Sequence, residues 1–339
     1  MLSRMVASPW FAVACALCCV PVPAKPAPWP DLSKPHLISV RGGRRFNIIC
    51  VGSGSPTVIF EQGADGSMAD WREVQPAIST LTRTCLYDRA GFGFSDPPNG
   101  PITGTFTTDD LHALLRRAHV ARPVVLVGHS MGGFYATLYA DRFKSEVAGL
   151  VLVDPAFPKQ FDPPTEAERK LEEGNINGGY AHLDGCANLA GAGKLTEQDR
   201  HDCFRLDPTL SATDARYVLS MFTRPSWYKA EVSQSRAFFP AAEADSVDAL
   251  EEQRAARSWG DLPTIVLTAG IVGRDDGQSD AVYNDFVARW KAGHDALAAR
   301  STAGESILVP SAHHFIQLEA PQVVIDAIRR VVAEVRDDH

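Results

Sequence analysis

Ser130 lies in the sequence Gly-His-Ser-Met-Gly at 128–132, the strongest chemical signal in the chain. The apolar run 124–127 precedes it, and an amphipathic stretch follows. A sharp turn from strand to helix would expose the serine, and glycines at both flanks would let neighbouring backbones pass. The pattern therefore predicts a serine positioned to attack an acyl carbon.

Such a serine is a useful nucleophile only when a histidine removes its proton and a carboxylate orients that histidine. In turns of this kind the acid and the histidine both follow the serine along the chain. His313 and His314 come directly after the last apolar run, 307–309, so one of them is the candidate base. Three other histidines between Ser130 and His313 have positions that favour structural or solvated roles: His182, His201 and His294.

Two places along the chain offer a carboxylate for that histidine. Asp154 ends the apolar run 150–153, which places it at the same sheet edge as Ser130. Asp275 and Asp276 lie in the loop after the run 264–268, farther from the strand end than a direct reach requires. We favour Asp154 and keep Asp275, together with Asp276, as the alternative acid.

A tetrahedral intermediate also needs backbone amides directed at its oxyanion. The amide of Met131, directly after the serine, is one candidate. Ala64 is the second, because it follows the flexible Gly63 in the loop after the apolar run 57–60.

These residues require a sheet that brings distant segments to one edge. Eight short runs read as strands: 37–41, 46–51, 57–60, 84–87, 124–127, 150–153, 264–268 and 307–309. The later runs are almost continuously apolar, as in strands buried on both faces, and amphipathic stretches separate them. The predicted fold class is therefore α/β, with an eight-stranded, mostly parallel sheet and helices on both faces. The first two strands, joined across Gly42 and Gly43, are expected to be antiparallel.

The strand and helix alternation stops after Asp154 and resumes near Leu262. Residues 155–261 are therefore predicted to form a helical cap, or lid, inserted into a core made of 37–154 and 262–339. Several glycines are expected to break its helices: Gly174, Gly178, Gly179, Gly191 and Gly193. Its aromatic residues would line an apolar substrate pocket or form the cap's own small core: Phe222, Trp227, Tyr228, Phe238 and Phe239.

The first 24 residues have the pattern of a secretory signal peptide. Arg4 precedes an uncharged stretch, and small residues end it at Ala24. The stretch is short for a membrane span and rich in proline, so we expect cleavage, export to the periplasm or medium, and no stable membrane insertion afterwards. Residues 25–36 form a Pro-rich linker. Lipid attachment at Cys15 is the weaker alternative.

Four cysteines remain after such cleavage, an even number that suggests two disulfides in an exported protein. Proximity favours Cys50 with Cys85 and Cys186 with Cys203, and four buried thiols are the alternative. Close Cys or His ligand spacing is absent from the sequence, so no metal site is predicted. With 33 Lys and Arg against 41 Asp and Glu, the net charge of −8 excludes a nucleic-acid partner.

The chain resembles the α/β-hydrolase fold superfamily over most of 37–154 and 262–335. Four segments carry the resemblance: Gly63-Ala64, 88–96 (DRAGFGFSD), 128–132, and 314–321 (HFIQLEAP). Members of the family commonly have a catalytic histidine seven residues before a proline, which implies His314 because Pro321 follows it at that distance. Some members take their acid after the sixth strand, which implies Asp154.

Together with the predicted signal peptide, the resemblance implies an exported serine hydrolase that cleaves a carboxylic ester or related acyl bond, without a cofactor. Its partner would be a small ester-type substrate with an apolar portion. Family dehalogenases and epoxide hydrolases use an aspartate nucleophile, and Ser130 argues against both. The alternatives are acyl transfer, cleavage of a carbon–carbon or amide bond, and a catalytically inactive ligand-binding protein.

Overall fold

The computed structural model describes residues 29–40, 42–158, 160, 166–204, 206–239, 246–274 and 278–337. The predicted signal peptide, 1–24, lies outside the described residues. The alternative acids Asp275 and Asp276 also lie outside them.

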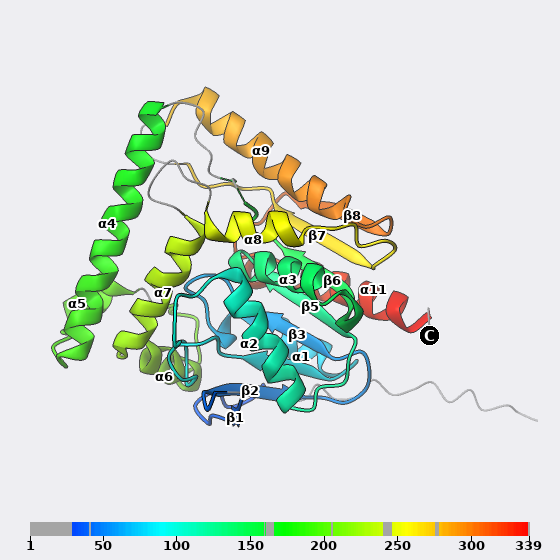
Figure 1. The fold of residues 1–339 in the computed structure, drawn as a ribbon, viewed down its shortest axis with the longest axis horizontal. Helices are drawn as coiled ribbons and strands as arrows, with labels where there is room; N and C mark the ends of the chain where they lie inside the picture. Colours follow the sequence, from blue (N-terminus) through cyan, green and yellow to red (C-terminus); the bar gives the residue numbers. More distant parts are fainter. Residues whose placement is uncertain are drawn as a thin grey trace, which may run out of the picture.

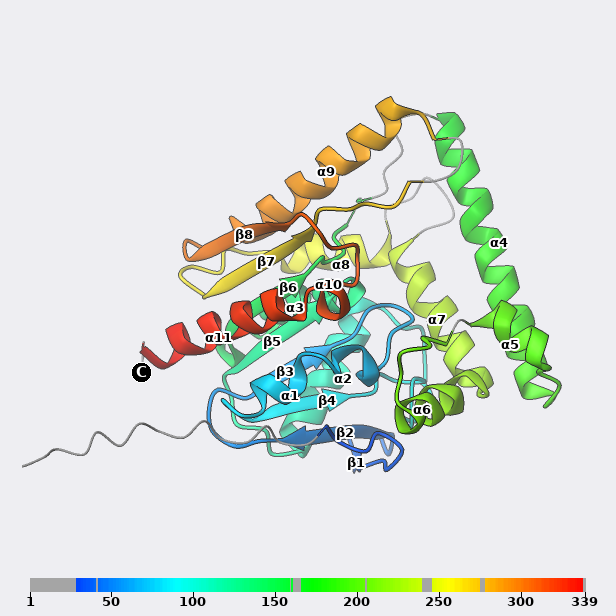
Figure 2. The same cartoon turned by 180° about the vertical axis from the view of Figure 1, so that it is seen from behind.

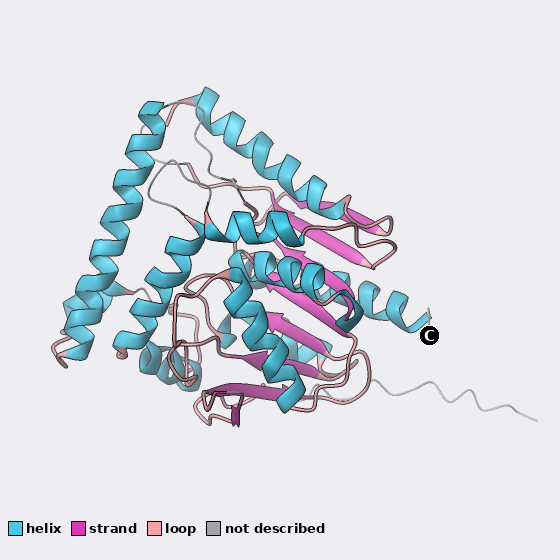
Figure 3. Ribbon diagram, in the orientation of Figure 1, coloured by secondary structure: helices cyan, strands magenta, loops and turns pink. Residues whose placement is uncertain are grey.

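Eight strands form one sheet in the order β1-β2-β4-β3-β5-β6-β7-β8 (Figure 3). They are β1 (Leu37–Ser39), β2 (Arg45–Val51), β3 (Val58–Glu61), β4 (Thr84–Tyr87), β5 (Val124–His129), β6 (Val147–Val153), β7 (Thr264–Ala269) and β8 (Gly304–Val309). The pairs β1–β2 and β2–β4 are antiparallel and the other pairs are parallel. The predicted fold class is confirmed.

Helices cover both faces of the sheet (Figures 1 and 2). One face carries α2 (Gly104–Arg117), α3 (Met131–Arg142) and α9 (Asp280–Ala298), and the other carries α1 (Gln75–Ile78) and α11 (Pro321–Asp337). The apolar strand residues alternate between these two layers, so each central strand is buried on both sides.

Thr107 with Asp110 three residues later is a sequence pattern that predicts a helix N-terminus, but the helix α2 begins earlier, at Gly104. Thr103 caps it, because its hydroxyl accepts a hydrogen bond from the amide of Phe106. A start at Thr107 is therefore wrong by one turn.

Between β6 and β7 the described residues form five helices: α4 (Glu166–Gly191), α5 (Glu197–Cys203), α6 (Ala212–Phe222), α7 (Pro225–Phe238) and α8 (Val247–Ala255). Figure 1 shows α4 to α7 beside the sheet, at the end to which the arrowheads of the parallel strands β3 to β8 point. This is the sheet edge at which Ser130 and Asp154 follow β5 and β6. None of the described helices has the length and apolar character that crossing a bilayer requires.

The expectation that glycines interrupt the inserted helices is wrong for Gly174, Gly178 and Gly179. All three lie inside the 26-residue helix α4, with open space where a β-carbon would stand. A glycine costs a helix about 1 kcal/mol relative to alanine but does not forbid it. Packing of α4 along α7 stabilises the helix despite this local cost.

Both predicted disulfides are present. Cys50 and Cys85 lie directly opposite each other on the antiparallel strands β2 and β4, with a Cα–Cα distance of 4.1 Å. The second disulfide, Cys186–Cys203, joins α4 to the end of α5. His182 lies close to both of its sulfurs, but disulfide sulfurs are not thiolates and do not bind zinc as thiolates do.

Candidate active site

Ser130 occupies the tight turn between β5 and α3. Its backbone has φ 52° and ψ −124°, a conformation that non-glycine residues rarely adopt. Two hydrogen bonds fix this conformation: the Ser130 amide donates to Val153 O, and the Ala156 amide donates to Ser130 O at 2.8 Å. The turn is thus tied to the end of β6, and Ser130 remains partly exposed.

The glycines on either side of Ser130 are required by close backbone approaches. A β-carbon on Gly132 would lie 2.4 Å from the carbonyl oxygens of both Glu61 and Gln62. A β-carbon on Gly128 would lie 2.4 Å from Gly132 O. These contacts bring the loop after β3 directly against the turn that carries Ser130.

Asp154 and His314 meet at the same edge of the sheet. The distance from His314 Nδ1 to Asp154 Oδ2 is 2.7 Å. The other carboxylate oxygen, Oδ1, accepts hydrogen bonds from the amide of Ala269 at 2.9 Å and from the indole N–H of Trp290 at 3.0 Å. Asp154 itself has φ 43°, and its amide donates to Leu267 O.

The pKa of Asp154 reflects these partners more than its burial. Burial alone would raise the pKa of the carboxyl, but the hydrogen bond from His314, the charge of that ring and the amide of Ala269 hold it below its usual range. Asp154 is therefore a carboxylate near neutral pH, and it can stabilise a protonated His314.

His314 lies beside the turn that carries Ser130. Its ring centroid is 4.6 Å from that of His129, and His129 Nε2 is 2.9 Å from the carbonyl oxygen of His314. Burial, followed by the proximity of His314, lowers the pKa of His129 to about 3, so His129 is neutral and donates through Nε2. Among the described residues Ser130 Oγ has no hydrogen-bond partner. Catalytic hydrogen bonds of this type often tighten only when substrate binds.

The other candidate histidines have different surroundings. His313 is exposed, and its Nδ1 lies 2.9 Å from Glu319 Oε2. His182 Nε2 lies 3.0 Å from the carbonyl of Asp202. His294 is fully buried between Thr268 Oγ1 and Pro155 O, and burial lowers its pKa.

The loop with Gly63 and Ala64 is held by Arg89, a residue of the 88–96 segment. The buried guanidinium donates to the carbonyls of Gln62, Gly63 and Ala64 at 2.6 to 2.9 Å, and to Glu61 Oε1. In a trans peptide the N–H is directed opposite to the carbonyl. Because Gly63 O is directed at Arg89, the Ala64 N–H is directed away from it.

Met131 is the first residue of α3, so its amide has no acceptor within the helix. The positive end of the helix dipole adds to the donor strength at this point. The structure thus combines a helix N-terminus with the Ala64 loop around Ser130, whose Cβ lies 3.4 Å from the position of a β-carbon on Gly63.

Sequence reasoning did not assign roles to Arg89 or Trp290. Arg89 belongs to the 88–96 motif, which could have indicated a function for it. The motif does not show that its guanidinium donates to three carbonyls of the loop after β3. Trp290 lies on α9, 136 residues from the carboxylate it contacts, and carries no local signal.

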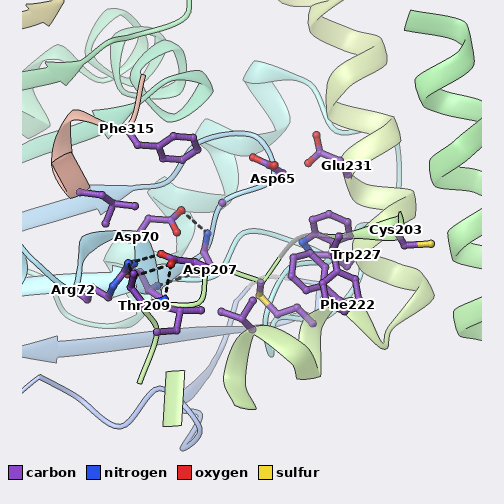
Figure 4. Close-up of a pocket in the computed structure, with 18 of the residues that line it drawn as sticks. Asp65, Asp70, Arg72, Cys203, Asp207, Thr209, Phe222, Trp227, Glu231 and Phe315 are labelled. Carbon is purple, nitrogen blue, oxygen red and sulfur yellow. Dashed lines mark hydrogen bonds and ion pairs between the residues drawn. The ribbon is translucent and has the colours of Figure 1, made fainter. Parts of the chain in front are cut away.

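A cavity of about 900 Å³ adjoins this site (Figure 4). It lies between the loop after β3, the start of α10 (Ile316–Glu319) and the inserted helices α4 to α7. Its lining includes Asp65 and Phe315, which are the chain neighbours of Ala64 and His314.

The predicted aromatic residues divide between two environments. Phe222 and Trp227 line the cavity. Tyr228 is fully buried and donates a hydrogen bond to Phe222 O, whereas Phe238 packs edge-on against Phe134 of α3. Phe239 packs edge to face against Phe238.

Comparison with known proteins identifies the fold family. The model of the alpha/beta hydrolase fold family matches residues 56–321, which is more than half of the chain. The chain belongs to the α/β-hydrolase fold family. As a member of this family it is a hydrolase-fold protein whose relatives include esterases, epoxide hydrolases and dehalogenases.

Among curated proteins, a 2-hydroxy-6-oxo-2,4-heptadienoate hydrolase from Pseudomonas putida is 36% identical over 115 residues, covering 33% of this chain and 41% of the relative. The matched segments span only 15% to 45% of the length of the curated relatives.

Two solved structures illustrate the likeness of the fold. A thermophilic esterase from Thermogutta terrifontis aligns with a TM-score of 0.56 and 20% identity, covering 89% of this chain and 99% of the esterase. A haloalkane dehalogenase from Agrobacterium tumefaciens aligns with a TM-score of 0.63 and 20% identity, covering 89% of this chain and 97% of the dehalogenase.

Proposed function

We propose that this protein is an exported serine hydrolase that cleaves a carboxylic ester through an acyl-serine intermediate. The observation that carries the proposal is the 2.7 Å contact between His314 Nδ1 and Asp154 Oδ2, beside the strained turn that exposes Ser130. An oriented histidine next to an exposed serine is the arrangement that activates a hydroxyl.

In the first step, Nε2 of His314 takes the Ser130 proton as Oγ attacks the ester carbonyl carbon. The Met131 and Ala64 amides donate to the oxyanion that forms. Collapse of the intermediate breaks the ester bond, and His314 returns the proton to the leaving alcohol. Water then attacks the acyl-serine by the same route, which releases the carboxylic acid and regenerates the Ser130 hydroxyl. Asp154 stabilises the protonated ring in both steps.

The residue type at the nucleophile position favours an ester over a halide or an epoxide. Family dehalogenases and epoxide hydrolases place an aspartate there, and this chain has Ser130. The helices of 155–261 would act as the lid over the site, with Phe222 and Trp227 beside the apolar part of the substrate.

Export is part of the same proposal. It rests on the signal-peptide pattern of residues 1–24 and on two disulfides, which persist in oxidising compartments. Lipid attachment at Cys15 is the alternative, and the mass of the mature protein purified from its native host distinguishes the two.

The decisive kinetic test compares the mature wild type with Ser130→Ala on 4-nitrophenyl butanoate. We expect kcat/KM to fall by a factor of about 10⁴ or more, because no other group replaces the nucleophile. Ser220→Ala is the matched control, since its hydroxyl bonds the carbonyl of Tyr217 on its own helix. Near-normal activity of Ser130→Ala would refute the assignment.

Carbon–carbon bond hydrolysis is the second candidate, and the similarity to the Pseudomonas putida hydrolase favours it. A 2-hydroxy-6-oxo-dienoate and an alkyl ester, offered to the same preparation, separate the two functions. A kcat/KM at least a hundredfold higher for the dienoate would replace the ester assignment. A faster ester would retain it.

A further inference from the structure

The cavity beside the active site is strongly acidic. Among its described lining residues six carboxylates stand against a single cation, Arg72 (Figure 4): Asp65, Asp70, Glu73, Asp207, Glu231 and Glu319. Arg72 forms ion pairs with Asp207 and Glu73, two of these six carboxylates. The cavity therefore holds an excess of negative charge that the described residues do not neutralise.

Three of these carboxylates have no cationic partner in the described part of the chain. Glu231 is 6% exposed, and its oxygens accept only neutral donors, from Gln234 and Ser235. Asp70 accepts the amide of Ser67. Asp65 is exposed and forms no ion pair within the described residues. A buried carboxylate without a cation is costly in its charged form, so a cation that enters the cavity would stabilise that form.

The charge of Asp65 acts on both of the other carboxylates. Burial, then the charge of Asp65, raises the pKa of Glu231 to about 7, and the same two causes contribute to the raised pKa of Asp70. A cation placed among the three would relieve this repulsion and favour their charged forms.

Aromatic rings also line the cavity, and Trp227 lies one turn before Glu231 on α7. Phe222 and Trp227 pack edge to face with ring centroids 4.6 Å apart, and Phe204 stacks on Phe222 at 4.0 Å. Phe315 adds a fourth ring on the side of His314. Aromatic rings beside carboxylates suit the methyl groups and the charge of an alkylammonium ion.

One buried donor in the cavity lacks a partner. The indole N–H of Trp227 makes no hydrogen bond within the described residues, although Trp227 is 3% exposed. Figure 4 shows this nitrogen on the edge of the ring that is directed away from α7. A neutral oxygen of a ligand, such as a carbonyl or ether oxygen, would satisfy it.

We propose that the cavity binds the cationic group of the substrate, so that the enzyme hydrolyses esters carrying a quaternary or protonated amine. The carboxylates of Asp65, Asp70 and Glu231 attract the ammonium, the aromatic rings contact its alkyl groups, and the Trp227 N–H binds a neutral oxygen. The proposal rests on the proposed esterase function for the reaction, but not for the binding.

Binding is tested first, with phenyltrimethylammonium and isothermal titration calorimetry on the mature protein. We expect saturable binding that Glu231→Gln weakens at least tenfold. Asp65→Asn, a change at an exposed side chain that cannot affect folding much, should also weaken it. Glu73→Gln is the matched control, because Glu73 lines the same cavity but is paired with Arg72. No binding, or equal binding by all variants, would overturn the proposal.

Turnover is tested with two pairs of esters of equal shape. Choline butanoate is compared with 3,3-dimethylbutyl butanoate, and the 4-nitrophenyl ester of 4-(trimethylammonio)butanoate with that of 5,5-dimethylhexanoate. We expect the cationic member of one pair to have at least a tenfold higher kcat/KM, lost in Glu231→Gln. Equal or faster turnover of both neutral esters would overturn the cation site and leave the esterase intact. Binding of the cation without Ser130-dependent turnover of any ester would overturn the esterase function and retain the cation site.

Discussion

Two buried carboxylates, Asp154 in the candidate active site and Glu231 in the adjoining cavity, behave in opposite ways. Both carboxylate oxygens of Asp154 form hydrogen bonds, with His314, Trp290 and Ala269. These partners hold the pKa of Asp154 below its usual range. Glu231 has only neutral partners, and burial raises its pKa to about 7. Burial alone therefore does not determine the charge of a side chain. The hydrogen-bond donors around a buried carboxyl group determine its pKa, and therefore whether it is charged near neutral pH.

The largest effect on kcat is expected from a change at Asp154. Asp154→Asn should lower kcat for 4-nitrophenyl butanoate by a factor of about 10³ to 10⁴, because His314 loses the group that orients it and stabilises its charge. Asp275→Asn, the alternative acid outside the described residues, should change kcat less than threefold. A large loss of kcat in Asp275→Asn with little change in Asp154→Asn would place the acid in the loop after β7. It would also remove the functional contrast between Asp154 and Glu231.

A smaller effect is expected when one donor to Asp154 is removed. Trp290→Phe deletes the indole hydrogen bond to Oδ1, and a hydrogen bond to a charged group contributes about 1.5 to 3 kcal/mol. We expect kcat to fall about ten- to a hundredfold, with KM little changed and the acid limb of the pH profile displaced.

Trp259→Phe is the control for this loss. Trp259 is also buried, and its indole N–H donates a hydrogen bond to Asp141 at 2.8 Å, near the opposite end of α3 from Ser130. Both variants lose a buried indole, but only the one at Asp154 should lower kcat. A similar drop in the two would show that core packing, rather than the hydrogen bond, is responsible.

The smallest effect is the dependence of stability on pH at Glu231. The native protein retains a proton that the unfolded chain releases above about pH 4.5, because the pKa rises from 4.5 to about 7 on folding. The free energy of unfolding therefore falls as pH rises between these values, by at most about 1.4 kcal/mol per pH unit for this group.

Glu231→Gln should remove that part of the slope. Urea unfolding at several pH values from 4.5 to 7 measures the free energy of unfolding of both proteins. If the free energy of unfolding of the wild type and of the variant changes equally with pH over this range, the raised pKa of Glu231 is contradicted.

The sequence was sufficient for the features that depend on local pattern. The strands are apolar runs, and the turn at Ser130 carries its own glycines, so the sheet and the exposed serine could be predicted from neighbouring residues. The position of Asp154 at the end of β6 followed from the strand order. The disulfides followed from proximity along the chain.

Features that depend on long-range packing could not be predicted in this way. The cavity gathers Asp65, Glu231 and Glu319 from three separate segments, and each of them alone reads as a solvated surface charge. Trp290 reads as an ordinary core residue of an amphipathic helix. The continuity of α4 is another such feature, because its glycines disfavour a helix locally and its packing on α7 stabilises the helix.

Covalent labelling of the wild-type protein with a fluorophosphonate, followed by peptide mass spectrometry, tests the central claim most directly. The reagent reacts with a serine whose hydroxyl is activated by a histidine. We expect one adduct, on Ser130, and a labelling rate at least a hundredfold lower in His314→Ala. An ester-hydrolysing preparation whose adduct lies on another residue, or which forms none, would contradict the account.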